Sequence, residues 1–256
     1  MRMLRFALGT TMGLSLLALG AVARADDPAP RDLLQKVVDT IPRNPFTAKA
    51  KLSSPTRGWV REMELSYKHV DNNDATYLEV TAPMDVKDTR FLLVDHPTGP
   101  DEQWIYVPAM KRAIQVSETT RKQPFLGSDF YVSDMVRPDI DAFNYRYLGG
   151  EDVGGRHCKL IESTPKNPEK ELYSKTVMAI DPTDLVITRT QFFDAKGQLL
   201  KVFTIDKLEK IDGQFTPLQQ VMKNVQDNTE SRLELTEVKF NATIPDEMFR
   251  KAYLIR

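Results

Sequence analysis

The feature that most constrains this chain is an alternation of apolar and polar residues that recurs through most of its length. From about Gly58 onward, runs such as Trp59–Tyr67 and Thr76–Ala82 place apolar side chains on most alternate positions. Successive side chains on a strand point to opposite faces of a sheet, so this pattern predicts strands with one buried face. The further runs of this kind are Arg90–Asp95, Gln103–Val107, Arg112–Ser117, Phe143–Leu148, His157–Ser163, Tyr173–Ile180, Val186–Asp194, Leu199–Leu208, Leu218–Val225 and Ser231–Phe240.

Residues typical of turns separate these runs, including Asp71–Asp74, Gly149–Gly150 and Asp212–Gly213. The pattern therefore predicts a mainly β fold, a long antiparallel meander of about eleven or twelve strands. A twisted sheet of that size curls, which favours a strongly curved half-barrel. The alternatives for its inner face are an apolar cavity and a solidly packed interior.

Three short helical segments are expected beside the sheet. Residues 32–39 place Leu33, Leu34, Val37 and Val38 at helical spacing before Pro42. A second helix is predicted around residues 128–136, capped by Ser128 or Asp129. A third is predicted at Pro245–Lys251. The first two are too few to cover a flat sheet, so we expect them to plug its concave side.

The first 25 residues have the pattern of a cleaved secretory signal. Arg2 and Arg5 precede an apolar run, Leu8–Val22, and the small residues of Ala23–Ala25 suit signal peptidase. The alternative is a membrane anchor, for which the run is short. The remaining residues, 26–256, are expected to form one domain located in the periplasm, a monomer without a lipidated N-terminus.

Charge and cysteine content narrow the class of partner. Without Arg2, Arg5 and Arg24 the chain has 32 basic and 36 acidic residues, a net charge of −4 with no block of like charge. This balance argues against binding to nucleic acid and against strong attraction to anionic membranes. The single cysteine, Cys158, lies in an alternating run and is interpreted as a small buried hydrophobic residue.

Residues that could carry covalent chemistry are scarce, so the sequence predicts no enzyme, metal or cofactor. His69, His96 and His157 lack metal-ligand spacing. Ser128 stands outside a G-x-S-x-G elbow, and a hydrolase that uses it is the weakest hypothesis. Lys111 and Arg112 could hold a phosphate headgroup or an acidic partner, but a solvated strand end fits them better.

Two ordered blocks carry a resemblance to a known family. They are Gln103–Arg112, which contains W-x-Y-x-P-x-x-K-R, and Phe125–Phe130, which contains G-S-D-F. Together with Tyr145–Leu148 and Tyr173–Val177, they resemble the outer-membrane lipoprotein-sorting proteins related to LolA and LolB. The resemblance covers nearly the whole chain after residue 25.

The resemblance implies a half-open antiparallel barrel with helices as a lid over an apolar cavity. It also implies carriage of lipid or lipoprotein acyl chains toward the outer membrane, with an inner-membrane transporter of the RND type as a partner. No single arginine matches the cavity arginine of LolA. An alternative from another class is an envelope sensor or assembly module that binds a protein partner through the sheet.

Large apolar residues are the candidate ligand contacts, although core packing explains each of them equally well. The expected cavity residues are Trp59, Met63, Leu65, Phe91, Leu93, Trp104 and Tyr106, and the expected lid residues are Phe125, Leu126, Phe130, Tyr131 and Met135.

Overall fold

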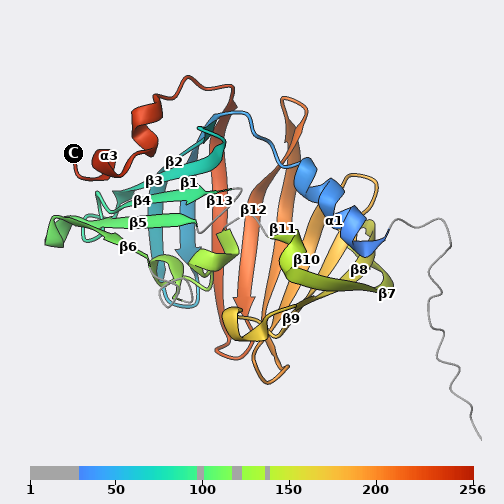
Figure 1. The fold of residues 1–256 in the computed structure, drawn as a ribbon. Helices are drawn as coiled ribbons and strands as arrows, with labels where there is room; N and C mark the ends of the chain where they lie inside the picture. Colours follow the sequence, from blue (N-terminus) through green and yellow to red (C-terminus); the bar gives the residue numbers. More distant parts are fainter. Residues whose placement is uncertain (1–28, 97–100, 117–122, 136–138) are drawn as a thin grey trace, which may run out of the picture.

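The computed structural model describes residues 29–96, 101–116, 123–135 and 139–256. The predicted signal sequence, residues 1–25, lies outside the described residues. Within them, antiparallel strands form one open, curved sheet of thirteen strands, accompanied by short helices (Figure 1). The mainly β, half-barrel fold class predicted from the alternation is confirmed, with thirteen strands in place of about eleven or twelve.

The strands are β1 (Phe46–Ser54), β2 (Trp59–Val70), β3 (Asn73–Ala82), β4 (Arg90–Asp95), β5 (Glu102–Val107), β6 (Arg112–Gln115), β7 (Phe143–Val153), β8 (Arg156–Pro165), β9 (Lys175–Asp181), β10 (Val186–Phe193), β11 (Leu199–Ile211), β12 (Gln214–Asn224) and β13 (Thr229–Phe240). The α-helices are α1 (Pro30–Asp39) and α3 (Lys251–Leu254). The predicted helix at 32–39 is thus confirmed as α1. The predicted C-terminal helix is a 3₁₀ turn, Asp246–Phe249, followed by α3.

Strand β1 was missed by the sequence interpretation, which began the sheet near Gly58. Its buried positions carry the small residues Ala48, Ala50 and Ser54 beside Leu52, so the alternation is present but weakly apolar. Alanine is also a strong helix former and a poor strand former, which hides the pattern from propensity. Two full-length neighbours, β2 and β13, hold β1 in the sheet.

The strand order places two strands that are consecutive in the chain at opposite edges of the sheet. Neighbouring strands run β6-β5-β4-β3-β2-β1-β13-β12-β11-β10-β9-β8-β7, so β6 and β7 are the two edges. The chain that follows β6 and precedes β7 therefore joins the two edges. Its described part includes residues 123–135, which we call the lid.

The inner face of the sheet, defined here as the face that the lid covers, carries the main core. Cross-strand rows follow from the register: Val80, Met63 and Ala50 are successive partners across β3, β2 and β1. Phe125 and Phe130 of the lid pack on this cluster with Leu52 and Leu78. Helix α1 packs on β8 and β9 through Leu33, Leu34 and Val37, against Ile161 and Ile180.

The C-terminal segment covers the opposite face at one side of the sheet. Ile244, Phe249 and Leu254 pack on Tyr77 and Leu92, which alternate with the inner residues of β3 and β4. This outer cluster also takes Trp104 and Tyr106 of β5. Elsewhere the outer face is charged: Lys49 stands opposite Glu64 and Lys51 opposite Glu62.

The prediction of a helix around residues 128–136 is wrong. Two 3₁₀ turns, Phe125–Gly127 and Val132–Met135, are separated by a segment with no helical turn, in which Ser128 is extended. Ser128 donates its hydroxyl to the main-chain oxygen of Phe125, at 2.7 Å, instead of capping a helix. The carboxylate of Asp129 is likewise engaged by side chains of other elements, as described below.

No helix in the described part of the chain is long and apolar enough to cross a lipid bilayer.

Truncation of Leu52 tests the inner-face assignment of β1. Leu52 is 1% exposed, so Leu52→Ala is expected to lower the free energy of unfolding by about 2–5 kcal/mol. Lys51→Ala on the outer face is the matched control and should change it by less than about 0.5 kcal/mol. Urea unfolding measures both, and equal effects of the two substitutions would contradict the two-faced placement of β1.

Candidate functional site

The inner face is hollowed into two adjacent apolar pockets. One, which we call the outer-end pocket, has a volume of about 390 Å³ and is lined by Phe46, Tyr67, Leu93 and Gln103 among others. The second, the central pocket, has a volume of about 380 Å³ and lies against Phe125 and Phe130 of the lid. Leu65, Leu78 and Met135 line both pockets, so the two adjoin at these residues. We call the two pockets together the groove.

The lid presents its apolar side chains to the sheet. Phe125 is 4.8 Å from Phe91 between ring centroids, and Phe130 meets Phe203 edge-on at 6.5 Å. The lid reverses direction between Phe125 and Phe130, because the N–H of Phe125 donates a hydrogen bond to the carbonyl of Phe130 at 2.7 Å. Gly127, with φ of +73°, takes the left-handed conformation that this reversal needs.

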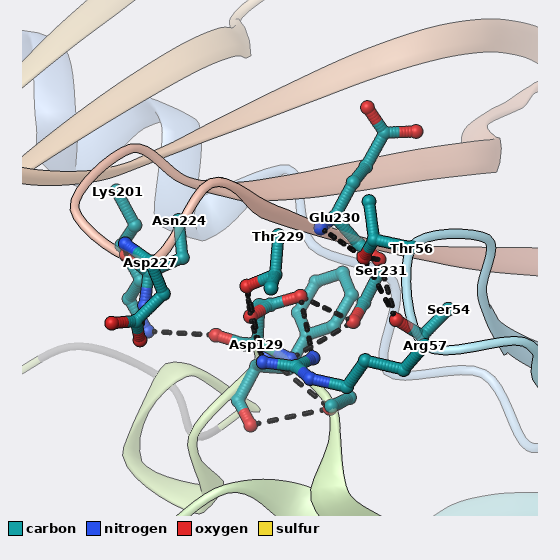
Figure 2. Close-up of polar contacts among 12 residues, drawn as sticks. Ser54, Thr56, Arg57, Asp129, Lys201, Asn224, Asp227, Thr229, Glu230 and Ser231 are labelled. Carbon is teal, nitrogen blue, oxygen red and sulfur yellow. Dashed lines mark hydrogen bonds and ion pairs between the residues drawn. The ribbon is translucent and has the colours of Figure 1, made fainter.

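Asp129 fastens one point of the lid to the sheet (Figure 2). Its carboxylate is 1% exposed and accepts hydrogen bonds from both terminal guanidinium nitrogens of Arg57, at 3.0 and 3.1 Å. It also accepts the hydroxyls of Thr229 and Ser231, each at 2.6 Å. Arg57 comes from the β1–β2 turn and the hydroxyls from β13, so three segments distant in sequence meet at one carboxylate.

The ionisation of Asp129 favours the contact between the lid and the sheet. Burial raises the pKa of its carboxyl, but hydrogen bonds from Arg57, Ser231 and Thr229 more than offset this, so the pKa lies below its usual value. Since the folded pKa is the lower one, the carboxylate stabilises the fold fully above the unfolded pKa of about 4. That contribution is lost as the pH falls through the folded pKa.

Asp134 fastens a second point of the lid, through Lys201 of β11. The Lys201 ammonium group is 2.6 Å from the carboxylate, and the two side chains are 1% and 5% exposed. Tyr173 donates its hydroxyl to the other oxygen of Asp134 at 2.7 Å. Lys201 also donates to the carbonyl of Asp129 at 3.2 Å, which links the two fastening points.

Aromatic rings enclose this second ion pair. The Lys201 nitrogen lies 3.7 Å from the ring centroid of Tyr131 and 5.2 Å from that of Tyr173. Burial lowers the pKa of the Lys201 ammonium group, and Asp134 counteracts part of this effect. Burial raises the pKa of the Tyr173 hydroxyl, and the neighbouring Asp134 carboxylate raises it further, which keeps that phenol a proton donor.

Most of the predicted cavity and lid residues are gathered on the inner face. Trp59, Met63, Leu65, Phe91 and Leu93 all pack in the inner core, together with the lid residues Phe125, Leu126, Phe130 and Met135. Tyr131 lies over Lys201 instead. Whether any of these residues contacts a ligand stays a prediction.

Trp104 and Tyr106 lie on the opposite face, so their predicted position in the cavity is wrong. The Lys251 nitrogen of α3 is 3.8 Å from the Trp104 ring centroid, and the Arg90 guanidinium is 5.1 Å from that of Tyr106. The inner positions of β5 are held by Gln103 and Ile105. The larger side chains were assigned to the inside, but the C-terminal segment gives them an apolar cover on the outside.

Several residues of the site carried signals that the sequence interpretation did not use. Lys201 alternates in phase with Phe203, which indicates a lysine on an apolar face. Asp129, in the G-S-D-F block, was assigned a local capping role. Arg57 gave no signal, because nothing local marks its pairing with Asp129.

The described residues contain no group of three or more histidine, cysteine or acidic side chains that could hold a metal ion. His69 bonds Asp74, His96 bonds Asn73, and His157 bonds Asp152 at an exposed turn. Cys158 is buried, as expected, with its sulfur 3.4 Å from the Thr188 hydroxyl.

The polar residues that the sequence interpretation considered for catalysis or headgroup binding are Ser128, Lys111 and Arg112. Ser128 is 1% exposed, and its hydroxyl partners are main-chain atoms of Phe125 and Phe130, a structural role for this serine. Lys111 and Arg112 are exposed at the start of β6.

Comparison with known proteins places the chain in a family and gives its fold. A model of a family described as "Uncharacterized protein" matches residues 72–256, well over half of the chain. The chain belongs to this family. Among curated proteins, the kinesin-like protein KIF28 of Mus musculus is 25% identical over 205 residues, 70% of this chain and 19% of that protein. The chain thus spans about a fifth of the length of that relative.

Solved structures share the whole architecture. An outer membrane lipoprotein-sorting protein domain from Vibrio parahaemolyticus superposes with a TM-score of 0.82 at 24% identity, over 89% of this chain and 98% of that one. A DUF1329 family protein from Desulfovibrio piger gives 0.82 at 22%, over 89% and 100%. A LolA superfamily protein from Nitrosomonas europaea gives 0.68 at 18%, over 89% and 100%. The fold is therefore LolA-like, as the resemblance implied.

Replacement of Asp129 by asparagine tests the first lid fastening. Asp129→Asn keeps the shape but leaves Arg57 without its counter-charge, so it should lower the free energy of unfolding by about 2–3 kcal/mol at pH 7. The difference from wild type should shrink as the pH falls below about 4, because the unfolded wild-type chain then binds a proton that the folded carboxylate, with its lower pKa, does not yet bind.

Asp141→Asn is the matched control for that experiment. The pKa of Asp141 is likewise held below its usual value by Arg31, but the side chain is 75% exposed. No measurable loss of stability is expected there. Urea unfolding from pH 7 to pH 3 compares the variants, and an Asp129→Asn effect that did not change with pH would contradict a charge-based fastening.

Proposed function

We propose that this protein is a periplasmic carrier that holds a lipid or lipoprotein acyl chain in the groove beneath its lid, for transfer toward the outer membrane. The observation that carries the proposal is the mainly apolar groove itself, two adjoining pockets of about 390 and 380 Å³ that share Met135 in their lining. A curved sheet with these pockets on its inner wall offers an acyl chain a mainly apolar surface. The LolA-like fold, seen in a lipoprotein-sorting domain, supports the same function.

The energetics of the groove suit a cargo that must be both held and released. Each methylene group moved from water into an apolar site contributes about 0.8 kcal/mol, so a chain of moderate length binds through many weak contacts. No strong polar contact to the chain is needed, and none has to be broken at delivery.

The lid is suited to gate this groove. It rests on the central pocket through Phe125 and Phe130, and ion pairs at Asp129 and Asp134 hold it in place. Movement of the lid away from the sheet would have to separate both buried pairs, which is costly because each charge would need new partners. We propose that delivery includes this separation.

The proposed location follows from the signal-like sequence at residues 1–25 and from the envelope role named for the lipoprotein-sorting domain. An inner-membrane transporter of the RND type, implied by the family resemblance, stays a prediction for the partner. The carrier role involves no covalent step.

A charge placed at Met135 tests the carrier function. Met135 is partly exposed and lines both pockets, so Met135→Glu should tolerate folding while placing a carboxylate in the groove. Binding of the neutral fluorescent probe N-phenyl-1-naphthylamine is expected to weaken at least about tenfold, since a buried charge is costly. Met110→Glu, at a methionine 52% exposed on the β5–β6 connection, is the matched control and should bind as wild type does.

Mass spectrometry of the protein purified from periplasm provides the companion measurement. Wild type and Met110→Glu are expected to carry co-purified lipid, and Met135→Glu to carry less. Equal probe binding by both variants, with no lipid on wild type, would exclude the carrier function.

A further inference from the structure

The outer-end pocket reaches the protein surface at the connection between α1 and β1, residues 40–45. Ile41 and Pro42 of this connection line the pocket. Ile41 is 40% exposed, whereas the other large apolar residues of the lining are buried or partly buried. A side chain that lines a pocket and also contacts solvent marks the place where the pocket opens.

Aromatic rings form the wall just inside this opening. Phe46 begins β1 directly after the connection, and its ring centroid lies 5.3 Å from that of Tyr67 and 5.5 Å from that of Phe240. All three residues line the outer-end pocket. An acyl chain that passed residues 40–45 would therefore meet an apolar surface at once, and this surface continues to Met135, where the central pocket adjoins.

The central pocket, by contrast, is closed on the side of the lid. None of the described residues that line it is exposed. The two lid phenylalanines in its wall, Phe125 and Phe130, are 4% and 6% exposed. Solvent therefore reaches the groove more readily at residues 40–45 than beneath the lid.

Neutral hydrogen bonds hold the connection between α1 and β1. Its start continues the hydrogen bonding of α1. Farther along, the side chain of Asn44 donates to that of Asn241 at 3.0 Å in an exposed position, and the carbonyl of Pro45 accepts from the N–H of Ala242 at 3.2 Å. An exposed hydrogen bond between neutral groups contributes little net free energy, because water replaces it when it breaks.

The lid is held more firmly, by the buried ion pairs of Asp129 and Asp134. Separating a buried pair costs more than breaking an exposed neutral hydrogen bond, because both charges then need new partners. Among the residues that the structure describes, no hydrogen bond or ion pair joins the connection to the lid. Figure 1 shows the connection running from α1 to β1 across one end of the sheet. Displacing the connection therefore does not require the lid to open.

We infer that an acyl chain enters the groove at its outer end, past residues 40–45, while the lid stays fastened to the sheet. The groove then has two gates, the connection for uptake and the lid for delivery. This inference rests on the proposed carrier function and describes how that site is filled. Two gates of unequal strength let the protein load freely and keep its cargo until the lid is opened.

A removable block at residue 41 tests this route in the full chain. The one native cysteine, Cys158, is buried, so Ile41→Cys supplies the accessible thiol. A methanethiosulfonate reagent that carries biotin labels it through a mixed disulfide, and stopped-flow fluorescence follows the uptake of N-phenyl-1-naphthylamine. The adduct is expected to slow uptake at least about tenfold, and reduction with dithiothreitol should restore the rate of the unlabelled variant.

Met84→Cys with the same adduct is the matched control. Met84 is 82% exposed on the connection between β3 and β4 and lines neither pocket of the groove. Its adduct should change the uptake rate less than about twofold.

A second pair of variants loosens each gate separately. Asn44→Ala removes the exposed bond to Asn241, so it should accelerate both uptake and release about two- to fivefold and leave the affinity unchanged. Asp129→Asn loosens the lid instead. If uptake passed beneath the lid, Asp129→Asn would accelerate it more than Asn44→Ala does, and we expect the reverse order.

An adduct at residue 41 that did not slow uptake, or a larger acceleration by Asp129→Asn than by Asn44→Ala, would overturn the inference and leave the carrier function standing. Wild-type protein that took up no probe at all would instead overturn the carrier function, and this inference with it.

Discussion

The structure depends on one topological constraint, the placement of β6 and β7 at opposite edges of the sheet. The chain enters the sheet at its middle, where β1 pairs with β13, and builds outward to β6 before it resumes at the far edge. The chain between β6 and β7 has to connect these edges, and its described residues 123–135 lie over the inner face. The strand order therefore requires a connection between the edges, and packing places the lid on the inner face. The lid needs no separate domain.

A crossing of this kind must be held down, because ordering a long connection costs conformational entropy. The two buried ion pairs supply directed contacts at Asp129 and Asp134, with partners on the β1–β2 turn and on β11. Buried ion pairs contribute little net stability, but their geometry is specific. Polar fastening points keep the lid in register while the groove beside Met135 stays unfilled.

The sequence predicted much of this arrangement, and its errors have identifiable physical causes. Alternation located twelve of the strands, and the apolar residues of the G-S-D-F block, predicted to form the lid, pack on the inner core. It missed β1, where alanines make the buried face weakly apolar. It placed Trp104 and Tyr106 inside because they are large, whereas the inner positions of β5 belong to Gln103 and Ile105. Asp129 was given a local capping role because capping is the partner that sequence neighbours can supply.

By itself, the sequence determined the β class, the two-faced character of each strand, the helix at residues 30–39 and the absence of a recognisable catalytic motif. These are local properties, readable from a period of two or of 3.6 residues. Only the tertiary structure decided which face of each strand is covered and by what, and which distant charges meet. Those choices depend on segments far apart in the chain: the C-terminal residues that cover Trp104, Arg57 opposite Asp129, and Lys201 opposite Asp134. A periodic pattern carries no record of such long-range pairing, because it is the same whichever face becomes the inside.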